Sequence, residues 1–185
     1  MLRPVVEPML AKAIDALPAP AVFARFAGEL KYDGFRALLF TGSGRGPVLL
    51  QSRRGNLIQG SFPDLVAAAR EQLSEGLVLD GELVVWNGTE LSFAAVQRRA
   101  SSGTRGALQL ARSLPAHYVA FDILTFHAES LVNRPYIERR AVLETLFADR
   151  ELTAPWTLCP MTRDRGVAEE WLRDWTEVPG LEGLL

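Results

Sequence analysis

The order of the apolar segments is the feature of this sequence that most restricts its fold. Short runs of strand character alternate irregularly with segments whose apolar residues recur at helical spacing. The strand-like runs cover residues 26–40, 48–52, 76–86 and 117–126, and the helical segments cover residues 62–73, 92–100, 137–148 and 167–175. This order lacks the regular β-α-β rhythm of a parallel sheet. We therefore predict an α+β fold with mostly antiparallel sheets.

Local signals set the limits of these segments. Three glycines between residues 42 and 46, followed by Pro47, predict a turn between the first two strands. Ser61 is the expected N-cap of the first long helix. Residues 101–106 are polar and predict a loop. Residues 1–20 are rich in proline and alanine, and they predict an arm that lies on a domain.

The composition favours a globular protein of the cytoplasm. Hydrophobic residues make up 48% and charged residues 23% of the 185 residues, which supports a core and argues against a disordered chain. No apolar run reaches the length that spans a bilayer, and the first residues lack the pattern of a signal peptide. The single cysteine, Cys159, excludes an internal disulfide and favours a packing role. A reducing cytoplasm is therefore the expected location.

The charge balance restricts how the chain can contact nucleic acid. A net charge of −2 and a pI near 5.8 argue against a broadly basic surface. Contacts with phosphate are therefore expected only at local clusters of arginine. The candidates are Arg53 with Arg54, and Arg98 with Arg99 and nearby Arg105. Each cluster, taken alone, is interpreted as a solvated surface pair.

Lysine is rare in this chain, which narrows the choice of an amine nucleophile. Of the 20 basic residues only Lys12 and Lys31 are lysines, and Lys12 lies in the N-terminal arm outside any motif. Lys31 lies in an apolar strand region with Gly34 close by, in the order Glu-Leu-Lys-Tyr-Asp-Gly-Phe-Arg. We expect its side chain to be buried, and burial or neighbouring cations lower the pKa of a lysine and free its lone pair for attack. The alternative is a strand end whose charges are solvated.

Two further segments place carboxylates inside apolar runs. Asp80, Gly81 and Glu82 interrupt the run of residues 76–86, where a carboxylate needs a cation, a hydroxyl or a metal as partner. A turn at Asp-Gly that joins two strands is the alternative. Phe121 and Asp122 lie in the last strand-like run, where the aromatic ring serves either the core or the stacking of a base.

Together these segments form an ordered series. Lys-x-Asp-Gly-x-Arg is followed by Ser-Arg, Asp-Gly-Glu, Phe-Asp and finally Glu-Gly near the end. The series closely resembles the motifs of the covalent nucleotidyltransferases, and among them the ATP-dependent DNA ligases of the bacterial type associated with end joining and repair. Supporting matches lie at residues 8–11, 62–65, 93–98, 135–136 and 138–140. The resemblance covers essentially the whole chain.

The resemblance implies a nucleotide-binding role for most motif residues. Lys31 would attack the α-phosphate of ATP and hold AMP through a phosphoramidate bond. Glu29 would accept a hydrogen bond from the adenine amino group, with the backbone of Leu30 nearby. Phe121 would stack on adenine, and Arg36 would bind the ribose or phosphate side of the nucleotide.

The resemblance also implies contacts with phosphate, metal and DNA. Arg53 would face phosphate, and Glu82 would hold a ribose hydroxyl or help place Mg²⁺ or Mn²⁺, with Glu182 as the second acidic residue near the metal. AMP would pass to the 5′-phosphate of nicked or broken double-stranded DNA, for sealing in repair and recombination. The implied fold is the nucleotidyltransferase fold of DNA ligases and mRNA capping enzymes, an ATP-grasp-like arrangement of antiparallel sheets flanked by helices.

The family's motifs extend further than this sequence, which ends at Leu185 as a new strand begins. The resemblance implies another lysine after Glu-Gly, a last motif with paired lysines, and an OB-fold barrel. We therefore expect residues 1–20 to form an arm and residues 21–185 a ligase adenylation domain that is incomplete at its C-terminus. By itself this chain is expected to be weak or inactive, with a separate C-terminal ligase fragment or repair proteins as partners.

Two alternatives stay open at this point. Within the superfamily, an RNA ligase or a capping-type guanylyltransferase shares Lys-x-Asp-Gly, although the flanking matches favour a DNA ligase. Outside it, a non-catalytic nucleotide- or DNA-binding remnant fits the missing lysines and the acidic net charge.

Overall fold

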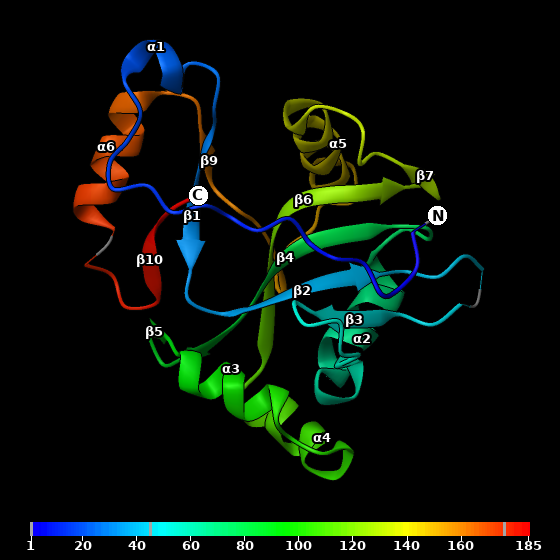
Figure 1. Cartoon of the computed structure of the whole chain (residues 1–185). Helices are drawn as coiled ribbons and strands as arrows, with labels where there is room; N and C mark the ends of the chain where they lie inside the picture. The colour runs from blue at the N-terminus through cyan, green and yellow to red at the C-terminus, as the bar shows by residue number, and fades with distance from the viewer. Residues whose placement is uncertain (1, 45, 176) are drawn as a thin grey trace.

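The computed structural model describes residues 2–44, 46–175 and 177–185, and two sheets dominate it (Figure 1). The large sheet has the strand order β3-β2-β4-β6-β7, with β5 paired to β4 and β8 paired to β6. The small sheet has the order β10-β1-β9. All pairings are antiparallel except that of β6 with β8. The predicted α+β class with mostly antiparallel sheets is therefore confirmed.

The strands have the following bounds: β1 Gly28–Tyr32, β2 Phe35–Phe40, β3 Leu49–Ser52, β4 Val78–Asn87, β5 Glu90–Leu91, β6 Ala116–Phe126, β7 Glu129–Ser130, β8 Trp156–Leu158, β9 Met161–Thr162 and β10 Leu181–Leu184. The helices are α1 Pro20–Phe23, the 3-10 helix η1 Gln59–Ser61, α2 Pro63–Gln72, α3 Phe93–Ala100, α4 Thr104–Ser113, α5 Tyr136–Asp149 and α6 Arg165–Asp174. None of the helices in the described part of the chain has the length and apolar character needed to cross a bilayer.

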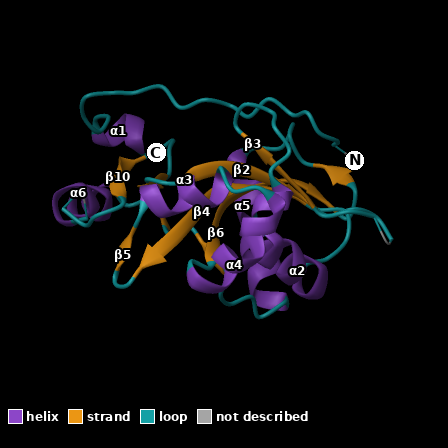
Figure 2. Ribbon diagram, turned by 90° about the horizontal axis from the view of Figure 1, so that it is seen from below, coloured by secondary structure: helices purple, strands orange, loops and turns teal. Residues whose placement is uncertain are grey.

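The two faces of the large sheet have different surroundings. Figure 2 shows α2, α4 and α5 on one side of this sheet and the N-terminal segment on the other. Side chains alternate between the faces of a strand, so Leu79 and Leu83 of β4 enter the main core under the helices. Asp80 and Glu82 consequently lie on the opposite face, which β2 extends with Arg36. This face carries the candidate site.

The N-terminal segment lies across that face and reaches the small sheet's helix. Val6 and the side chain of Gln51 exchange two hydrogen bonds, of 2.8 and 2.6 Å. Further along, the carbonyl of Met9 accepts from Arg36 at 2.8 Å, and the carbonyl of Pro18 accepts from Arg165 of α6 at 3.0 Å. The segment is thus held at both sheets.

One of the predicted strand boundaries is wrong. Residues 26–40 form two strands, β1 and β2, which belong to different sheets. The run of residues 76–86 contains one strand, and the alternative of two strands joined by a turn is excluded because β4 runs straight through Asp80, Gly81 and Glu82. Gly81 is needed there for packing, since a Cβ atom would lie 2.5 Å from the ring of Tyr118. The strand expected at the end of the chain is present as β10.

Two helix predictions also need correction. Phe62, instead of Ser61, occupies the N-cap position of α2, and the Ser61 hydroxyl donates to the carbonyls of Ala100 and Ser102. The loop expected over residues 101–106 is shorter than predicted, because α4 begins at Thr104. Residues 101–106 carry no apolar residue at helical spacing. The buried side of α4 is marked by Ala107, which lies beyond this polar stretch.

Candidate functional site

The turn between β1 and β2 sets the position of the candidate nucleophile. The amide of Asp33 donates to the carbonyl of Gly180 at 2.8 Å, which ties the turn to the segment before β10. A Cβ atom at Gly34 would lie 2.5 Å from the carbonyl oxygen of Leu83 and 2.7 Å from Cγ of Glu82. Only glycine therefore lets the turn approach β4 this closely, and the approach brings Lys31 near Glu82.

Lys31 itself is half-exposed, which corrects the expectation of a buried lysine. Its side chain is 42% exposed and forms an ion pair with Glu182 of β10, which is 45% exposed. The register of the small sheet explains the exposure, because Lys31 lies opposite Gly183, which has no side chain to cover it. The lysine lies among three carboxylates, since Glu82 and Asp33 also interact with it electrostatically.

Glu82 is the most strongly perturbed carboxyl group near the lysine. Burial raises the pKa of Glu82 to about 8, and Asp80 and Asp33 act in the same direction while Arg36 and Lys31 oppose the rise. Among the described residues no hydrogen bond to its carboxylate is seen. A buried carboxyl group with a raised pKa and no fixed partner is typical of a functional site.

Arg36 is engaged within the protein. Its Nε and Nη2 donate to the two oxygens of Asp80 at 3.0 and 2.7 Å, and its Nη1 donates to the carbonyl of Met9. Its guanidinium also lies over the ring of Phe121, 5.4 Å from the centroid. A nucleotide would therefore have to compete with Asp80 for the guanidinium of Arg36. The sequence predicted that Asp80 would need a cation, a hydroxyl or a metal as partner, and in the structure this partner is Arg36.

Glu29 lies on β1, two residues before Lys31, and contacts helix α5. Its Oε1 accepts from the hydroxyl of Tyr136 at 2.7 Å and from Nη1 of Arg140 at 3.0 Å. Burial raises the pKa of Glu29 to about 7, although Tyr136 and Arg140 both lower it. Both α5 residues lie within the supporting family matches at residues 135–136 and 138–140, but no role was predicted for them.

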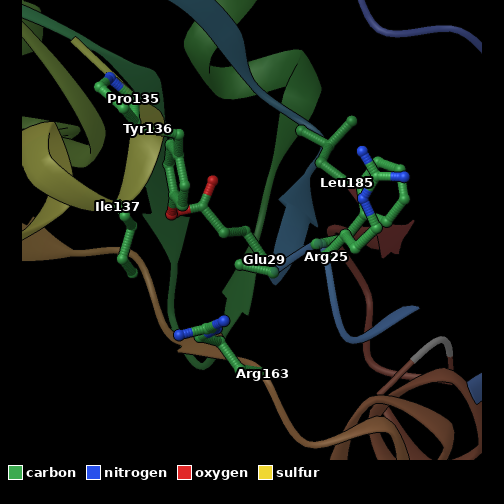
Figure 3. Close-up of a pocket in the computed structure, with 9 residues that line it drawn as sticks. Arg25, Glu29, Pro135, Tyr136, Ile137, Arg163 and Leu185 are labelled. Atoms are coloured by element: carbon green, nitrogen blue, oxygen red, sulfur yellow. The ribbon is translucent and has the colours of Figure 1, made fainter. Parts of the chain in front are cut away.

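A cavity of about 400 Å³ lies beside Glu29. Apolar groups form most of its wall, and Arg25, Glu29, Tyr136 and Arg163 supply its polar side chains. Figure 3 shows Glu29 between Tyr136 on one side and Arg25 with Leu185 on the other, with Arg163 below. The cavity therefore offers an apolar slot with one carboxylate and two arginines.

Leu30 lies between Glu29 and Lys31 on β1, and its side chain is on the opposite face of the strand from theirs. Leu30 is 3% exposed, and its carbonyl accepts a weak hydrogen bond from Sγ of Cys159 at 3.6 Å. Burial raises the pKa of the Cys159 thiol to about 12. Cys159 is thus a buried packing residue, as predicted.

The arginine clusters separate into exposed and structural residues. Arg53 is exposed in the turn after β3, and no ion pair to it is seen among the described residues. Arg99 is fully buried and forms an ion pair with Asp64, so the Arg98–Arg99 cluster is not a surface pair. Only Arg98 of that pair is available to a ligand.

The carboxylates around Lys31 could hold a metal ion only if a bound ligand supplies further oxygen atoms. Within the described ranges no group of three or more His, Cys, Asp and Glu side chains could hold a metal ion. Mg²⁺ commonly binds one or two carboxylates plus substrate phosphates. Glu82 and Glu182, which both interact with Lys31, match that smaller requirement.

Comparison with known proteins gives the family. The model of the family described as "ATP dependent DNA ligase domain" matches residues 8–185. This chain belongs to the ATP-dependent DNA ligase domain family. DNA ligase C2 of Mycolicibacterium smegmatis is 37% identical over 98% of this chain and 49% of its own length. DNA ligase C of Mycobacterium tuberculosis is 36% identical over the whole chain and 50% of its own length. The chain thus spans about half the length of these relatives.

Solved structures agree with this family. A mycobacterial DNA ligase D complexed with ATP and MES has a TM-score of 0.61 and 28% identity, over 85% of this chain and 46% of that one. The ligase domain of M. tuberculosis LigD has a TM-score of 0.57 and 31% identity, over 73% of this chain and 39% of that one. The predicted ligase fold is therefore confirmed.

Proposed function

We propose that this chain is the adenylation part of an ATP-dependent DNA ligase and that Lys31 is the residue that accepts AMP. Membership of the ligase family supports the reaction, and the position of Lys31 carries the choice of residue. Lys31 is one of two lysines, and it alone lies on a motif strand beside carboxylates. In this assignment residues 1–20 form an arm and residues 21–185 the adenylation domain.

The first step requires an uncharged amine at Lys31. Nζ of Lys31 donates to Oε2 of Glu182, and because the lysine is half-exposed the proton that the ammonium group loses can pass to water. The nitrogen then forms a bond to the α-phosphorus of ATP, and the bond to pyrophosphate breaks. Glu82 and Glu182 would hold Mg²⁺ or Mn²⁺, which supplies stabilisation of the phosphate charge.

The other motif residues would hold the nucleotide. We assign Glu29 and the neighbouring backbone of Leu30 to the adenine amino group, and Phe121 to the face of the ring. Arg36 and Arg53 would contact ribose or phosphate. For Arg36 this contact replaces part of its pairing with Asp80.

The second half of the reaction concerns DNA. AMP would pass from Lys31 to the 5′-phosphate of nicked or broken double-stranded DNA, and the 3′-hydroxyl would displace it. A role in repair and recombination is supported by a relative named "Multifunctional non-homologous end joining protein LigD" from Mycobacterium bovis, 33% identical over 71% of this chain and 16% of its own length. Repair proteins are the proposed partners.

Residues 1–185 by themselves are proposed to adenylate weakly and to seal nicks poorly. The described groups that interact with Lys31 are carboxylates, and Arg36 is already paired. Stabilising a leaving pyrophosphate requires cations. The pairing of Arg36 with Asp80 leaves this cation less available to pyrophosphate. It therefore favours a non-catalytic nucleotide- or DNA-binding remnant as the second candidate.

Incubation with α-labelled ATP, Mg²⁺ or Mn²⁺ and a nicked duplex tests this proposal. We expect covalent label on the wild type and on Lys12→Arg, none on Lys31→Arg, and little sealing. Label from GTP instead of ATP would favour a capping-type enzyme. If the wild type carries no covalent AMP and binds ATP no better than Lys31→Ala, the remnant interpretation replaces ours.

A further inference from the structure

The carboxylate of Glu29 is held from one side only. Oε1 accepts both described hydrogen bonds, from Tyr136 and from Arg140. In the described part of the chain no donor to Oε2 is seen. Figure 3 shows the Glu29 carboxylate beside Tyr136, and Glu29 is one of the residues that line the cavity. One oxygen is therefore fixed by the protein and the other is free for a ligand.

The two donors form one rigid unit on helix α5. Tyr136 and Arg140 are four residues apart and so lie on the same helix face. The Arg140 side chain is 4% exposed and is fixed at two further points. Its Nε donates to Glu144 at 2.7 Å and its Nη2 donates to the carbonyl of Cys159 at 2.8 Å. A guanidinium fixed in this way fixes the carboxylate that it contacts.

We propose that Tyr136 and Arg140 are positioning residues that determine base selectivity, by turning Oε2 of Glu29 towards the exocyclic amino group of a purine. This inference rests on the proposed adenine contact of Glu29. An ionised carboxylate only accepts hydrogen bonds. A 6-amino group donates to Oε2, whereas a 6-keto oxygen at the same place would face a second acceptor and be rejected. Neither α5 residue needs to touch the nucleotide for this effect.

The charges around Glu29 support its ionised form at moderately alkaline pH. Burial raises the pKa of Glu29, the Tyr136 hydroxyl and Arg140 lower it, and Asp122 of β6 raises it. Arg25 and Arg163 line the cavity on the remaining sides, and the buried Cys159 lies behind the strand. Removing the Tyr136 hydroxyl therefore both loosens the carboxylate and makes its ionisation harder.

Equilibrium binding of two ligands separates positioning from a general structural role. The probes are the α,β-methylene analogues of ATP and of purine riboside triphosphate, which differ in the 6-amino group and cannot transfer the nucleotide. Calorimetry is carried out above the Glu29 pKa of about 7. We expect the wild type to prefer the ATP analogue. Tyr136→Phe should weaken the ATP analogue about tenfold and the purine riboside analogue less than about twofold, since only one hydrogen-bonded ligand group is affected.

Further variants make the outcome unambiguous. Arg140→Lys keeps the charge but cannot reach Glu29, Glu144 and the Cys159 carbonyl together, so it should also lose selectivity for the amino group. Glu138→Gln, an exposed change on the same helix, is the matched control and should change neither affinity. A thermal melt of each variant checks that it is folded.

The failure of this inference differs from failure of the proposed function. If Glu29→Gln selectively weakens the ATP analogue but Tyr136→Phe weakens both ligands equally or neither, the positioning role is wrong and the adenine contact stands. If the wild type itself binds both analogues equally, Glu29 does not recognise the amino group, and both the positioning role and the proposed adenine contact are overturned.

Discussion

The ion pair between Arg99 and Asp64 gives the sharpest prediction about stability. Arg99 is fully buried, and its two terminal nitrogens contact the two oxygens of Asp64 at 3.0 and 2.6 Å. The same carboxylate accepts the amide of Ala116 at 3.0 Å. Asp64→Ala removes all three hydrogen bonds and leaves a buried guanidinium without its counter-ion. Breaking a buried pair in this way costs about 3–5 kcal/mol.

The cost in this protein should fall at the lower end of that range. Asp64 is 23% exposed, so water can partly replace it, and the carbonyls of Ser61 and Leu114 still accept from Arg99. We therefore expect Asp64→Ala to lower the free energy of unfolding by about 3 kcal/mol. Asp149→Ala, an exposed change at the end of α5, is the control and should cost less than about 0.5 kcal/mol.

Urea denaturation followed by circular dichroism measures both variants. The double variant Asp64→Leu with Arg99→Met should recover most of the loss, because an apolar pair of similar volume needs no counter-ion. A cost below about 1 kcal/mol for Asp64→Ala would show that the pair does not support the fold. Weaker DNA binding by Arg99→Met at unchanged stability would instead restore the phosphate-binding interpretation of this cluster.

Three further predictions concern the site. Glu82→Gln mimics the protonated acid. The stability that the protonated Glu82 contributes to the wild type is fully present below pH 4.5 and is lost as the pH rises through about 8. Above pH 8 the variant should therefore be more stable than the wild type by up to about 5 kcal/mol in urea denaturation, and equal stabilities there would contradict this. Gly34→Ala should lower the free energy of unfolding by about 1–3 kcal/mol or more, whereas Gly60→Ala, in open space, should not. The preference of the wild type for the ATP analogue should disappear as the pH falls below about 7, where Glu29 is protonated, and calorimetry across that range would reveal a constant preference if this is wrong.

The motif residues were predictable from the sequence because chemistry restricts them locally. A chain with two lysines leaves little choice for an amine. The close approach of the Gly34 turn to β4 was not predicted, and it depends on the absent Cβ of Gly34. Strands with clear apolar patterns, such as β6 and β10, were likewise found in the expected places.

The surroundings of these residues were not predictable, because they depend on partners distant in the sequence. The exposure of Lys31 follows from Gly183 on the neighbouring strand. Arg36 is held by Asp80, and Glu29 by Tyr136 and Arg140, over separations that periodicity cannot detect. A polar segment such as residues 101–106 likewise conceals the start of α4, whose buried face begins only with later residues.

Identifying the residue that carries AMP is the most direct test of the central claim. The purified chain is incubated with ATP and Mg²⁺, digested, and its peptides are analysed by mass spectrometry with and without acid treatment. We predict an acid-labile AMP on the peptide that contains Lys31, and none on the peptide that contains Lys12. Adenylation of Lys12, or of a residue other than lysine, with Lys31 unmodified would contradict the account.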